Sequence, residues 1–219
     1  MNLTPTKIEQ KAAQYANALL EQATQYEPNI TEDLQKIAAE VAAEMVGLEH
    51  KFKSEESLTR KISDEAAKSA RSLIDLGYSI DEAVKKSTMR QAERNNDALR
   101  YTFVFPLEKY VFGFRQTVEK LRQTGYEIPE NKIWNAWKNI GTLFDKGYRG
   151  INATVFSSQG QVFELQFHTR ASFEFKTETH LLYEESRQNR ASHERKIEIA
   201  EIIIGLAAKV KTPKGVKKL

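Results

Sequence analysis

The sequence contains no cysteine, which excludes disulfide bonds, thiolate nucleophiles and cysteine-bound metals. It also lacks a long hydrophobic run: the most apolar stretch, IAEIIIGLAAKV from Ile199, is shorter than the roughly 20 residues that cross a bilayer. The first residues, MNLTPTKIEQ, show no basic region followed by an apolar core, so we expect no secretory signal peptide. These absences favour action in the cytoplasm with no membrane partner, and they leave delivery by another route open.

The chain has no strong excess of charge, since 33 basic and 30 acidic residues give a net charge of +3. Hydrophobic residues make up 40% and charged residues 29% of the 219 residues, which is typical of a soluble globular protein. Basic residues gather near the end, where KVKTPKGVKKL holds five lysines and no acid. Such a segment is either a solvated end or a surface that attracts phosphate, including nucleic acid.

Hydrophobic periodicity divides the chain into helices, a small sheet and helices again. The helical period predicts helices over these ranges: 5–49 as two helices that meet at Pro28, 54–76, 81–95, 107–123, and 171–210 in two pieces. Alternation and β-branched or aromatic residues predict strands in DALRYTFVF, KIWNAW, YRGINATVF and QVFELQFHT. We therefore expect an α+β fold, with a small mixed β-sheet flanked by helices. We divide it into an N-terminal helical segment (1–49), a central domain (50–188), and a C-terminal helix with the basic tail (189–219).

A cluster of cations surrounds the start of the helix predicted near residue 54. In KFKSEESLTRKI it consists of Lys51, Lys53, Arg60 and Lys61. Together with Ser57 and the free N–H groups of the helix start, these cations could bind an anion such as phosphate. A solvated helix start, with Ser54 as its cap, explains the same residues.

Two carboxylates are candidates for a magnesium site. Asp97 lies at the head of the first long strand, with Arg100 three residues later, and Glu164 lies in the last strand. Magnesium prefers oxygen ligands and often takes only one or two protein carboxylates beside phosphates. An acid at a strand end can instead be a cap or turn residue, so a magnesium site requires the two carboxylates to meet.

The hairpin over 147–169 carries more polar groups than a structural hairpin needs. Alternation in QVFELQFHT puts Glu164, Gln166 and His168 on one face and three large apolar side chains on the other. We expect the apolar face to pack on helices and the polar face to be open, either as the floor of a cleft or as a plain water-facing surface. At the start of the preceding strand, Tyr148 could pack against the fold or offer a flat face to a base.

Taken in order, these segments resemble the motifs of the synthetase domain of the RelA/SpoT family, the alarmone pyrophosphokinases. KFKSEESLTRK is similar to the first motif, R-x-K-S-x-x-S-[IL]-x-x-K, and DALRYTF to the second, in which an aspartate precedes an arginine on a strand. GYRGIN, ELQFHT and THLLY take the places of G-Y-R-S-L-H, E-[VI]-Q-I-R-T and E-H-x-x-Y. The resemblance covers about residues 50–185 and implies the nucleotidyltransferase-like synthetase fold.

The resemblance implies Mg²⁺-dependent transfer of pyrophosphate from ATP to the 3′-hydroxyl of an acceptor nucleotide, with release of AMP. Asp97 and Glu164 would hold the magnesium, and Glu164 would also lie near the attacking hydroxyl as a candidate base. The resemblance assigns ATP binding to Lys51, Lys53, Ser57, Lys61 and Arg100. It assigns acceptor binding to Tyr148, which would stack on the base, Arg149, Asn152, Gln166 and His168.

Departures from the motifs fall mainly on the acceptor side. LFDKG stands where the family has P-K-x-N-G, Asn152 replaces a histidine, and His168 replaces an arginine; on the ATP side, Lys51 replaces an arginine. A related group within the family acts as toxins that use adenine nucleotides or the 3′ end of tRNA as acceptors. The altered motifs and the basic C-terminal segment fit that group better than the housekeeping one.

We therefore expect a growth-inhibiting toxin or effector that uses ATP as donor. Its acceptor would be GDP, GTP, ADP, ATP or tRNA, and an inhibitor or antitoxin protein would be a partner. The alternative is a catalytically silent module of the same fold that binds nucleotides or RNA. A third possibility is a helical interaction protein in which residues 1–49 serve as the adaptor.

Overall fold

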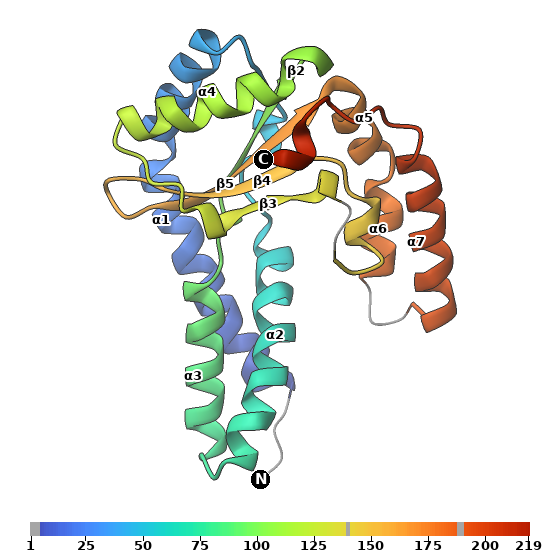
Figure 1. Ribbon diagram of the computed structural model, residues 1–219. Coiled ribbons are helices and arrows are strands. Elements are labelled where there is room, and N and C mark those ends of the chain that lie inside the picture. Colours follow the sequence, from blue (N-terminus) through green and yellow to red (C-terminus); the bar gives the residue numbers. More distant parts are fainter. Residues whose placement is uncertain (1–4, 139–140, 188–190) are drawn as a thin grey trace.

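The computed structural model describes residues 5–138, 141–187 and 191–219 of the chain. Figure 1 shows helices grouped around one β-sheet, so the α+β class predicted from the sequence is confirmed. The α-helices of the described residues are α1 (Pro5–Glu40), α2 (Glu55–Asp75), α3 (Ile80–Glu93), α4 (Tyr110–Gln123), α5 (Arg170–Glu178), α6 (His180–Ser186) and α7 (His193–Ala207). Among these residues no helix combines the length and the apolar character needed to span a membrane.

A mixed sheet lies at the centre of the fold and, in the described part of the chain, has the strand order β1-β2-β5-β4-β3. Its strands are β1 (Glu44–Val46), β2 (Arg100–Phe105), β3 (Ile133–Asn135), β4 (Ile151–Phe156) and β5 (Val162–Thr169). β2 and β5 run parallel, and the other neighbouring strands run antiparallel. Arg100 pairs with Glu164 in this register, so the segment that precedes β2 lies beside the start of β5. The topology thereby brings Asp97 toward Glu164.

One face of the sheet carries the main hydrophobic core. Alternation along β2 and β5 sends large apolar side chains to this face, where α1 and α4 cover them. The side chains concerned are Tyr101, Phe103, Phe105, Phe163, Leu165 and Phe167. Many of the rings meet edge to face, as Phe114 of α4 does with Phe167 at 4.9 Å between ring centroids. The apolar half of the predicted hairpin pattern is therefore the core of the fold.

The opposite face carries Glu164, Gln166 and His168 of β5 with Thr102 of β2, and the prediction that this face is open is wrong for Gln166 and His168, whereas Glu164 is partly exposed. Thr102, Gln166 and His168 are buried. Their exposed fractions are only 8%, 5% and 0%. α5 begins directly after β5 and folds back over it, so Ser172 Oγ lies 3.0 Å from His168 Nδ1 and Lys176 Nζ donates to Gln166 Oε1 at 2.5 Å. Alternation predicts which side chains share a face, but it does not predict which helix covers them.

α1 is a single helix that passes through Pro28, so the predicted break at this residue is wrong. Proline lacks the N–H that a helix interior uses and normally interrupts it. Here Ala23 and Ile30, on either side of Pro28, are buried in the core of the sheet, and this packing outweighs the lost hydrogen bond. After α1 the chain forms β1 and not a further helix, with Met45 opposite Phe103.

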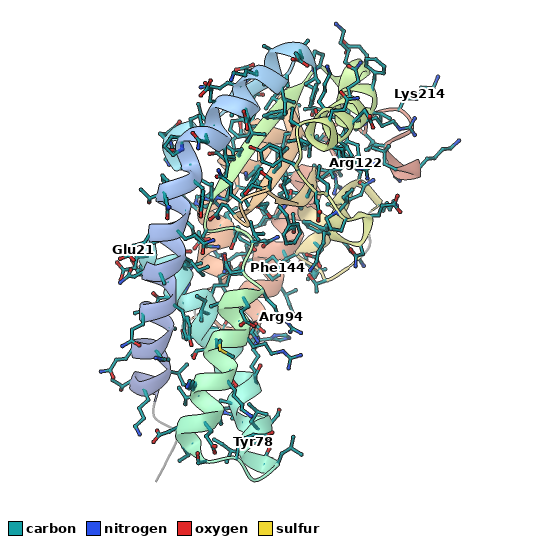
Figure 2. All side chains as sticks on the ribbon, turned by 90° about the vertical axis from the view of Figure 1, so that its left-hand side faces the viewer. Glu21, Tyr78, Arg94, Arg122, Phe144 and Lys214 are labelled. Carbon is teal, nitrogen blue, oxygen red and sulfur yellow. The ribbon has the colours of Figure 1, made fainter. Side chains whose placement is uncertain are left out.

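α1, α2 and α3 form a helical arm that extends beyond the sheet (Figure 1), with Tyr78 near its far end (Figure 2). At the near end, Leu58 and Ile62 of α2 pack with Ala98 in a small apolar cluster that also includes residues of α1. Ser54 caps α2 by accepting a hydrogen bond from the Ser57 N–H at 3.2 Å. The cluster therefore holds the start of α2, and the cations around it, against the head of β2.

In the described residues of the C-terminal region the helices are α5, α6 and α7, where the sequence pattern predicted two. The basic segment beyond α7 is anchored to the sheet: Val216 is fully buried, and its carbonyl accepts a hydrogen bond from Asn135 Nδ2 at 2.7 Å. The lysines of this segment are exposed. The expected boundary between residues 188 and 189 lies outside the described residues, and the boundary at residue 49 stays a prediction.

Candidate active site

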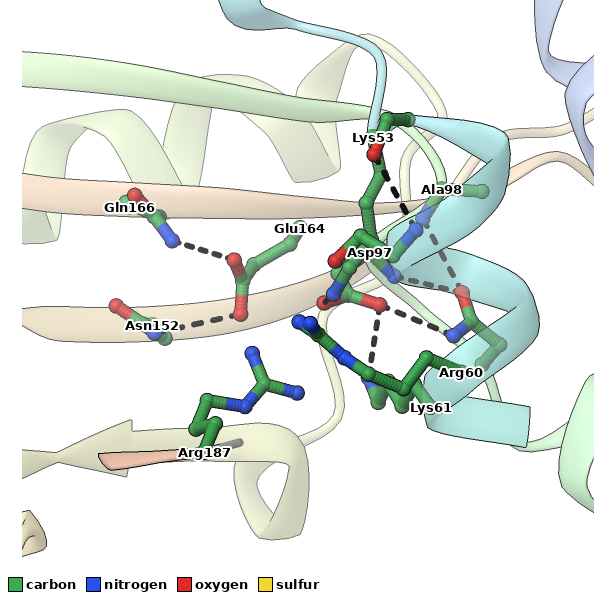
Figure 3. Close-up of polar contacts among 12 residues, drawn as sticks. Lys53, Arg60, Lys61, Asp97, Ala98, Asn152, Glu164, Gln166 and Arg187 are labelled. Atoms are coloured by element: carbon green, nitrogen blue, oxygen red, sulfur yellow. Dashed lines mark hydrogen bonds and ion pairs between the residues drawn. The ribbon is translucent and has the colours of Figure 1, made fainter. Parts of the chain in front are cut away.

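At the head of β2, the carboxylate of Asp97 forms ion pairs with two lysine side chains (Figure 3). Lys53 Nζ lies 2.5 Å from Oδ2 and Lys61 Nζ lies 2.7 Å from Oδ1. Asn95 fixes the loop, because its side-chain oxygen accepts the backbone N–H groups of Asp97 and Ala98 while its Nδ2 donates to Asp97 Oδ1 at 3.0 Å. The segment thus presents one carboxylate whose position is set by both backbone and side chains.

Burial and charge act in opposite directions on this group. Burial by itself raises the pKa of Asp97, but the charges and hydrogen bonds of Lys61 and Lys53 outweigh it and hold the pKa well below its ordinary value. Lys53 has an exposed fraction of 8%, and this burial lowers its pKa although Asp97 opposes the shift. Asp97 is therefore an ionised carboxylate at any pH at which the protein works.

Glu164 is the second carboxylate, and two side-chain amides orient it. Asn152 Nδ2 donates to Oε1 at 3.3 Å, and Gln166 Nε2 donates to Oε2 at 2.5 Å. Burial raises the pKa of Glu164, and the negative charge of Asp97 raises it further. Figure 3 shows the two carboxylates next to each other, as the magnesium interpretation of the sequence required.

A chain of hydrogen bonds behind Asn152 fixes the orientation of its amide. Tyr148 Oη donates to Asn152 Oδ1 at 2.9 Å, which leaves Asn152 Nδ2 facing Glu164. The Tyr148 hydroxyl has only one proton, so His168 Nε2, also 2.9 Å away, must donate to Tyr148 Oη. The neutral ring then has Nδ1 as an acceptor, 3.0 Å from Ser172 Oγ, whose single proton is shared between this nitrogen and the Thr169 carbonyl oxygen at 3.1 Å. Burial lowers the pKa of His168 well below its ordinary value, so this neutral tautomer holds at physiological pH.

A second chain reaches the other oxygen of Glu164 from α5. Lys176 Nζ donates to Gln166 Oε1, and Gln166 Nε2 donates to Glu164 Oε2. Burial, together with the nearby charge of Arg100, lowers the pKa of Lys176 to about 8. Both chains end by donating to Glu164, so the surroundings stabilise its carboxylate as a hydrogen-bond acceptor in one orientation.

Two arginines also face the carboxylates in Figure 3: Arg60, which belongs to the cation cluster identified in the sequence, and Arg187, which the sequence analysis missed. Arg60 of α2 forms an ion pair with Glu184 at 2.9 Å, and Arg187 lies 3.4 Å from the same glutamate. The Arg187 guanidinium also packs over the Tyr183 ring, 5.6 Å from its centroid. Arg187 follows Tyr183 by one helical turn, so the two residues share a helix face. This spacing after THLLY was the signal by which the sequence could have assigned Arg187 to the site.

Two predicted ATP-site residues, Lys51 and Ser57, have groups that are engaged in other contacts. Lys51 forms an ion pair with Glu27 of α1 at 2.8 Å, which holds it away from Asp97. The Ser57 N–H is used in the helix cap. Arg100 lies in the register opposite Glu164, and its charge acts on Glu164 and Lys176. Of the predicted ATP residues, Lys53, Lys61 and Arg100 therefore gather at the carboxylates.

On the acceptor side, the predicted flat face of Tyr148 is already in contact with another ring. Trp134 of β3 stacks on it, with 5.2 Å between ring centroids and 19° between the planes. Arg149 donates to the carbonyl oxygens of Lys146 and Tyr148, both at 2.8 Å, and so fixes the local backbone. β4 itself begins at Ile151, so Tyr148 and Arg149 precede the strand that they were expected to start.

Trp134 is a residue that the sequence analysis missed. KIWNAW was interpreted only as a strand, although its alternation was a signal that could have placed the tryptophan on the polar face. A groove of about 930 Å³ between α4 and β3 borders Trp134, but neither Asp97 nor Glu164 lines it. The charged centre is therefore separate from this groove.

The carboxylate pair can contribute oxygen ligands, and within the described residues no group of three His, Asp or Glu side chains forms a metal site. A magnesium ion held by Asp97 and Glu164 would take its remaining ligands from water or phosphate. The donor set fits such an ion, since both ligands are carboxylates and the charge of Asp97 raises the pKa of Glu164.

No protein-family model matches the sequence, and no curated protein matches it. Solved structures do. A chain in the crystal structure of the complex between the Type VI effector Tas1 and its immunity protein is 16% identical with a TM-score of 0.51, over 88% of this chain and 94% of that one. The small alarmone synthetase 2 from Bacillus subtilis is 17% identical (TM-score 0.48, 88% and 94% covered), as is a GTP pyrophosphokinase family protein from Streptococcus pneumoniae (0.49, 86% and 90%). At these identities the first match shows a shared fold over nearly the whole chain, and this fold is the one that the motifs led us to expect.

Proposed function

We propose that this protein transfers the pyrophosphate of ATP to the 3′-hydroxyl of an acceptor nucleotide in a Mg²⁺-dependent reaction. The observation that carries the proposal is the meeting of Asp97 and Glu164 at the head of two adjacent parallel strands, surrounded by lysine and arginine side chains. The order of the sequence motifs supports it.

The reaction makes one bond and breaks one. The acceptor 3′-oxygen bonds to the β-phosphorus of ATP, and the bond from that phosphorus to the oxygen bridging it to the α-phosphorus breaks, so AMP leaves with the bridging oxygen. The hydroxyl proton passes to a carboxylate oxygen of Glu164. A raised pKa suits Glu164 to this role, because a base is most effective when its pKa approaches the working pH.

Asp97 and Glu164 would hold magnesium, which supplies positive charge to the polyphosphate when bound. Each carboxylate oxygen has two lone pairs, and Oδ2 of Asp97 accepts only from Lys53, so it would keep one lone pair for the ion with both lysines in place. Lys53 and Lys61 would then lie beside the ion, with their remaining N–H groups available to phosphate oxygens.

Cations from α2 and from two segments outside the helices face the space in which the polyphosphate would lie. They are Lys61 and Arg60 in α2, Lys53 before α2, and Arg187 just after α6. Phosphoryl transfer is accelerated chiefly by positioning and by charge stabilisation of this kind. Arg60 and Arg187 share Glu184 as a partner, which fixes both guanidinium groups before substrate binds.

A growth-inhibiting effector is the biological role that we propose. The similar chain of the Tas1 complex is described together with an immunity protein, which supports a protein inhibitor as a partner here as well. The acceptor is a purine nucleotide (GDP, GTP, ADP or ATP) or the 3′ end of tRNA, and the site chemistry accommodates each because all offer a free 3′-hydroxyl.

The test is AMP formation from ATP, measured with and without Mg²⁺ and with and without each acceptor. If the protein is a transferase, AMP formation should require both Mg²⁺ and an acceptor. Binding of ATP without AMP formation for every acceptor would favour the alternative, a catalytically silent module of the same fold that binds nucleotides or RNA.

A further inference from the structure

We propose that the base of the acceptor stacks on Trp134, with Tyr148 as a fixed second layer behind it. This inference rests on the proposed function and concerns its acceptor side. It assigns the recognition of the acceptor base to a residue on the edge strand β3, outside the sequence motifs.

Tyr148 cannot easily turn to receive a base. Its hydroxyl is held by two hydrogen bonds, to Asn152 and to His168, both at 2.9 Å. His168 also contacts the ring itself at 77°, with 5.4 Å between ring centroids. Gly150 lies so close that a Cβ built on it would lie 3.0 Å from Tyr148 Cε1. The tyrosine is thus fixed from several sides, and Trp134 covers one face of its ring.

Trp134 is the accessible member of the stack. Its exposed fraction is 38%, which is high for a tryptophan in a strand. Among the described residues no group accepts a hydrogen bond from its indole N–H, whereas the N–H of the buried Trp137 donates to Tyr110. An exposed indole with an unused donor, held parallel to a rigid second ring, is a ready surface for a nucleobase.

The register places Trp134 at a suitable distance from the chemistry. Trp134 pairs with Asn152 of β4, and Asn152 pairs with Gln166 of β5. Asn152 also donates to Glu164, the proposed general base. The indole and the Glu164 carboxylate therefore lie on the same face of the sheet, two strands apart. Glu164 is two residues along β5 from Gln166, so the two backbone positions are roughly 12 Å apart, a span that the two side chains and a nucleoside can bridge with its base on the indole and its 3′-hydroxyl toward Glu164.

Stacking on an indole favours the larger surface of a purine, and it does not read the hydrogen-bonding edge of the base. The acceptor class that fits is therefore a purine nucleoside with a free 3′-hydroxyl, which both a mononucleotide and the terminal adenosine of tRNA provide. A mononucleotide and tRNA would make the same stacking contact with Trp134. They differ in the rest of the molecule attached to the stacked nucleoside.

The experiment follows tryptophan fluorescence of the full chain without ATP, so that no turnover occurs, during titration with GDP, ADP or bulk tRNA. Trp134 and Trp137 are the two tryptophans of the sequence, and Trp137 has an exposed fraction of 2%. We expect at least one of these acceptors to quench the emission of the wild type and to leave that of Trp134→Phe unchanged. Inorganic tripolyphosphate, which has no base, should not quench.

Affinity is measured in parallel by equilibrium dialysis with the labelled acceptor that quenches. Trp134→Ala should weaken acceptor binding by roughly tenfold or more, Trp134→Phe should recover part of the loss, and ATP binding should stay unchanged. Phe112→Ala, at an exposed aromatic residue of α4, is the matched control and should bind as the wild type does.

Wild-type acceptor affinity in Trp134→Ala would overturn the proposal, and so would the absence of quenching by every acceptor. The proposed function fails separately: quenching that depends on Trp134, without any AMP formation, would keep the stacking surface and reject the transferase. AMP formation at the wild-type rate and acceptor KM in Trp134→Ala would keep the transferase and reject the stacking surface.

Discussion

Asp97 and Glu164 lie next to each other at the head of β2 and β5, yet their pKa values are shifted in opposite directions. Two lysines hold the pKa of Asp97 low, whereas burial and the charge of Asp97 raise that of Glu164. Paired carboxylates whose environments separate their pKa values are typical of sites that divide two roles between them. Here Asp97 is suited to permanent ionisation and Glu164 to exchange of a proton.

Glu164→Gln should abolish transfer, since the amide retains the shape of the side chain but neither accepts a proton nor contributes a negative charge to a metal. We expect AMP formation to fall at least about 100-fold. The new NH₂ group faces one of the two amides that donate to Glu164, so some stability is lost, and the far-UV circular dichroism spectrum shows whether the variant is folded. Glu174→Gln, an exposed acid of α5, is the control that should retain activity. Full activity of Glu164→Gln would remove Glu164 from the mechanism.

Asp97→Asn should destabilise the fold because it leaves the buried Lys53 without its counter-charge. Removing one partner of a buried pair costs about 3 kcal/mol, measurable as a lower free energy of unfolding in urea. The double variant Lys53→Met with Asp97→Asn should recover part of this loss. If the double variant is as unstable as the sum of the single variants, the two side chains do not interact.

The same pair predicts a pH dependence of stability. The pKa of Asp97 is lowered in the fold, so its contribution is present above the ordinary value of about 4 and is lost as the pH falls below it. The stability difference between the wild type and Asp97→Asn should therefore shrink below about pH 4. A difference that stays constant through this range would contradict the lysine–aspartate geometry.

From the lowered pKa of Lys176 we predict a second pH dependence of stability, in the alkaline range. Its pKa is lowered to about 8, so between about pH 8 and 10.5 the unfolded chain binds a proton that the folded chain does not. Stability relative to Lys176→Met should rise over this range, by at most about 3 kcal/mol. Urea unfolding of both proteins at about pH 7.5, 9 and 10.5 measures this change. A difference that stays constant over the range would show that Lys176 titrates normally in the fold.

Tyr148→Phe retains the ring that stacks on Trp134 but removes the hydroxyl that links His168 to Asn152. The fully buried His168 then loses the acceptor for its N–H, which we expect to cost about 1–3 kcal/mol of stability. Without that hydroxyl the Asn152 amide can rotate away from Glu164, so kcat should fall while the KM for the acceptor changes little. An unchanged kcat would show that Glu164 is oriented without this chain.

Arg187→Ala should raise the KM for ATP or lower kcat by about tenfold, because a guanidinium that faces the carboxylates would no longer bind the polyphosphate. Lysine at this position should restore only part of the activity, since it lacks the planar fork that binds two phosphate oxygens. Arg71→Ala, at an exposed position of α2, serves as the control.

The sequence predicted the parts of the fold that local patterns determine. Alternation identified β2 and the hairpin of β4 and β5, and the cap at Ser54 marked the start of α2. β1 was missed because three residues are too few to show alternation, and the strand forms only because β2 offers it a partner. The helix through Pro28 was missed for a similar reason, since the packing that sustains it comes from distant residues.

For the candidate site, the sequence predicted Asp97, Glu164 and the lysines that surround them. It did not predict that α5 buries His168 and converts it from a surface group into a neutral link toward Glu164. Nor did it predict the stack of Trp134 on Tyr148, which depends on the register between β3 and β4. Contacts of this kind are set by tertiary packing, which no spacing within one segment encodes.

The most direct test of the account is incubation of the protein with ATP labelled in its β- and γ-phosphates and Mg²⁺, offering GDP, GTP, ADP, ATP and bulk tRNA in separate reactions. The account predicts that label moves to at least one acceptor in amounts equal to the AMP released, and that Glu164→Gln shows neither event. Folded protein that binds ATP but transfers label to none of these acceptors would contradict it.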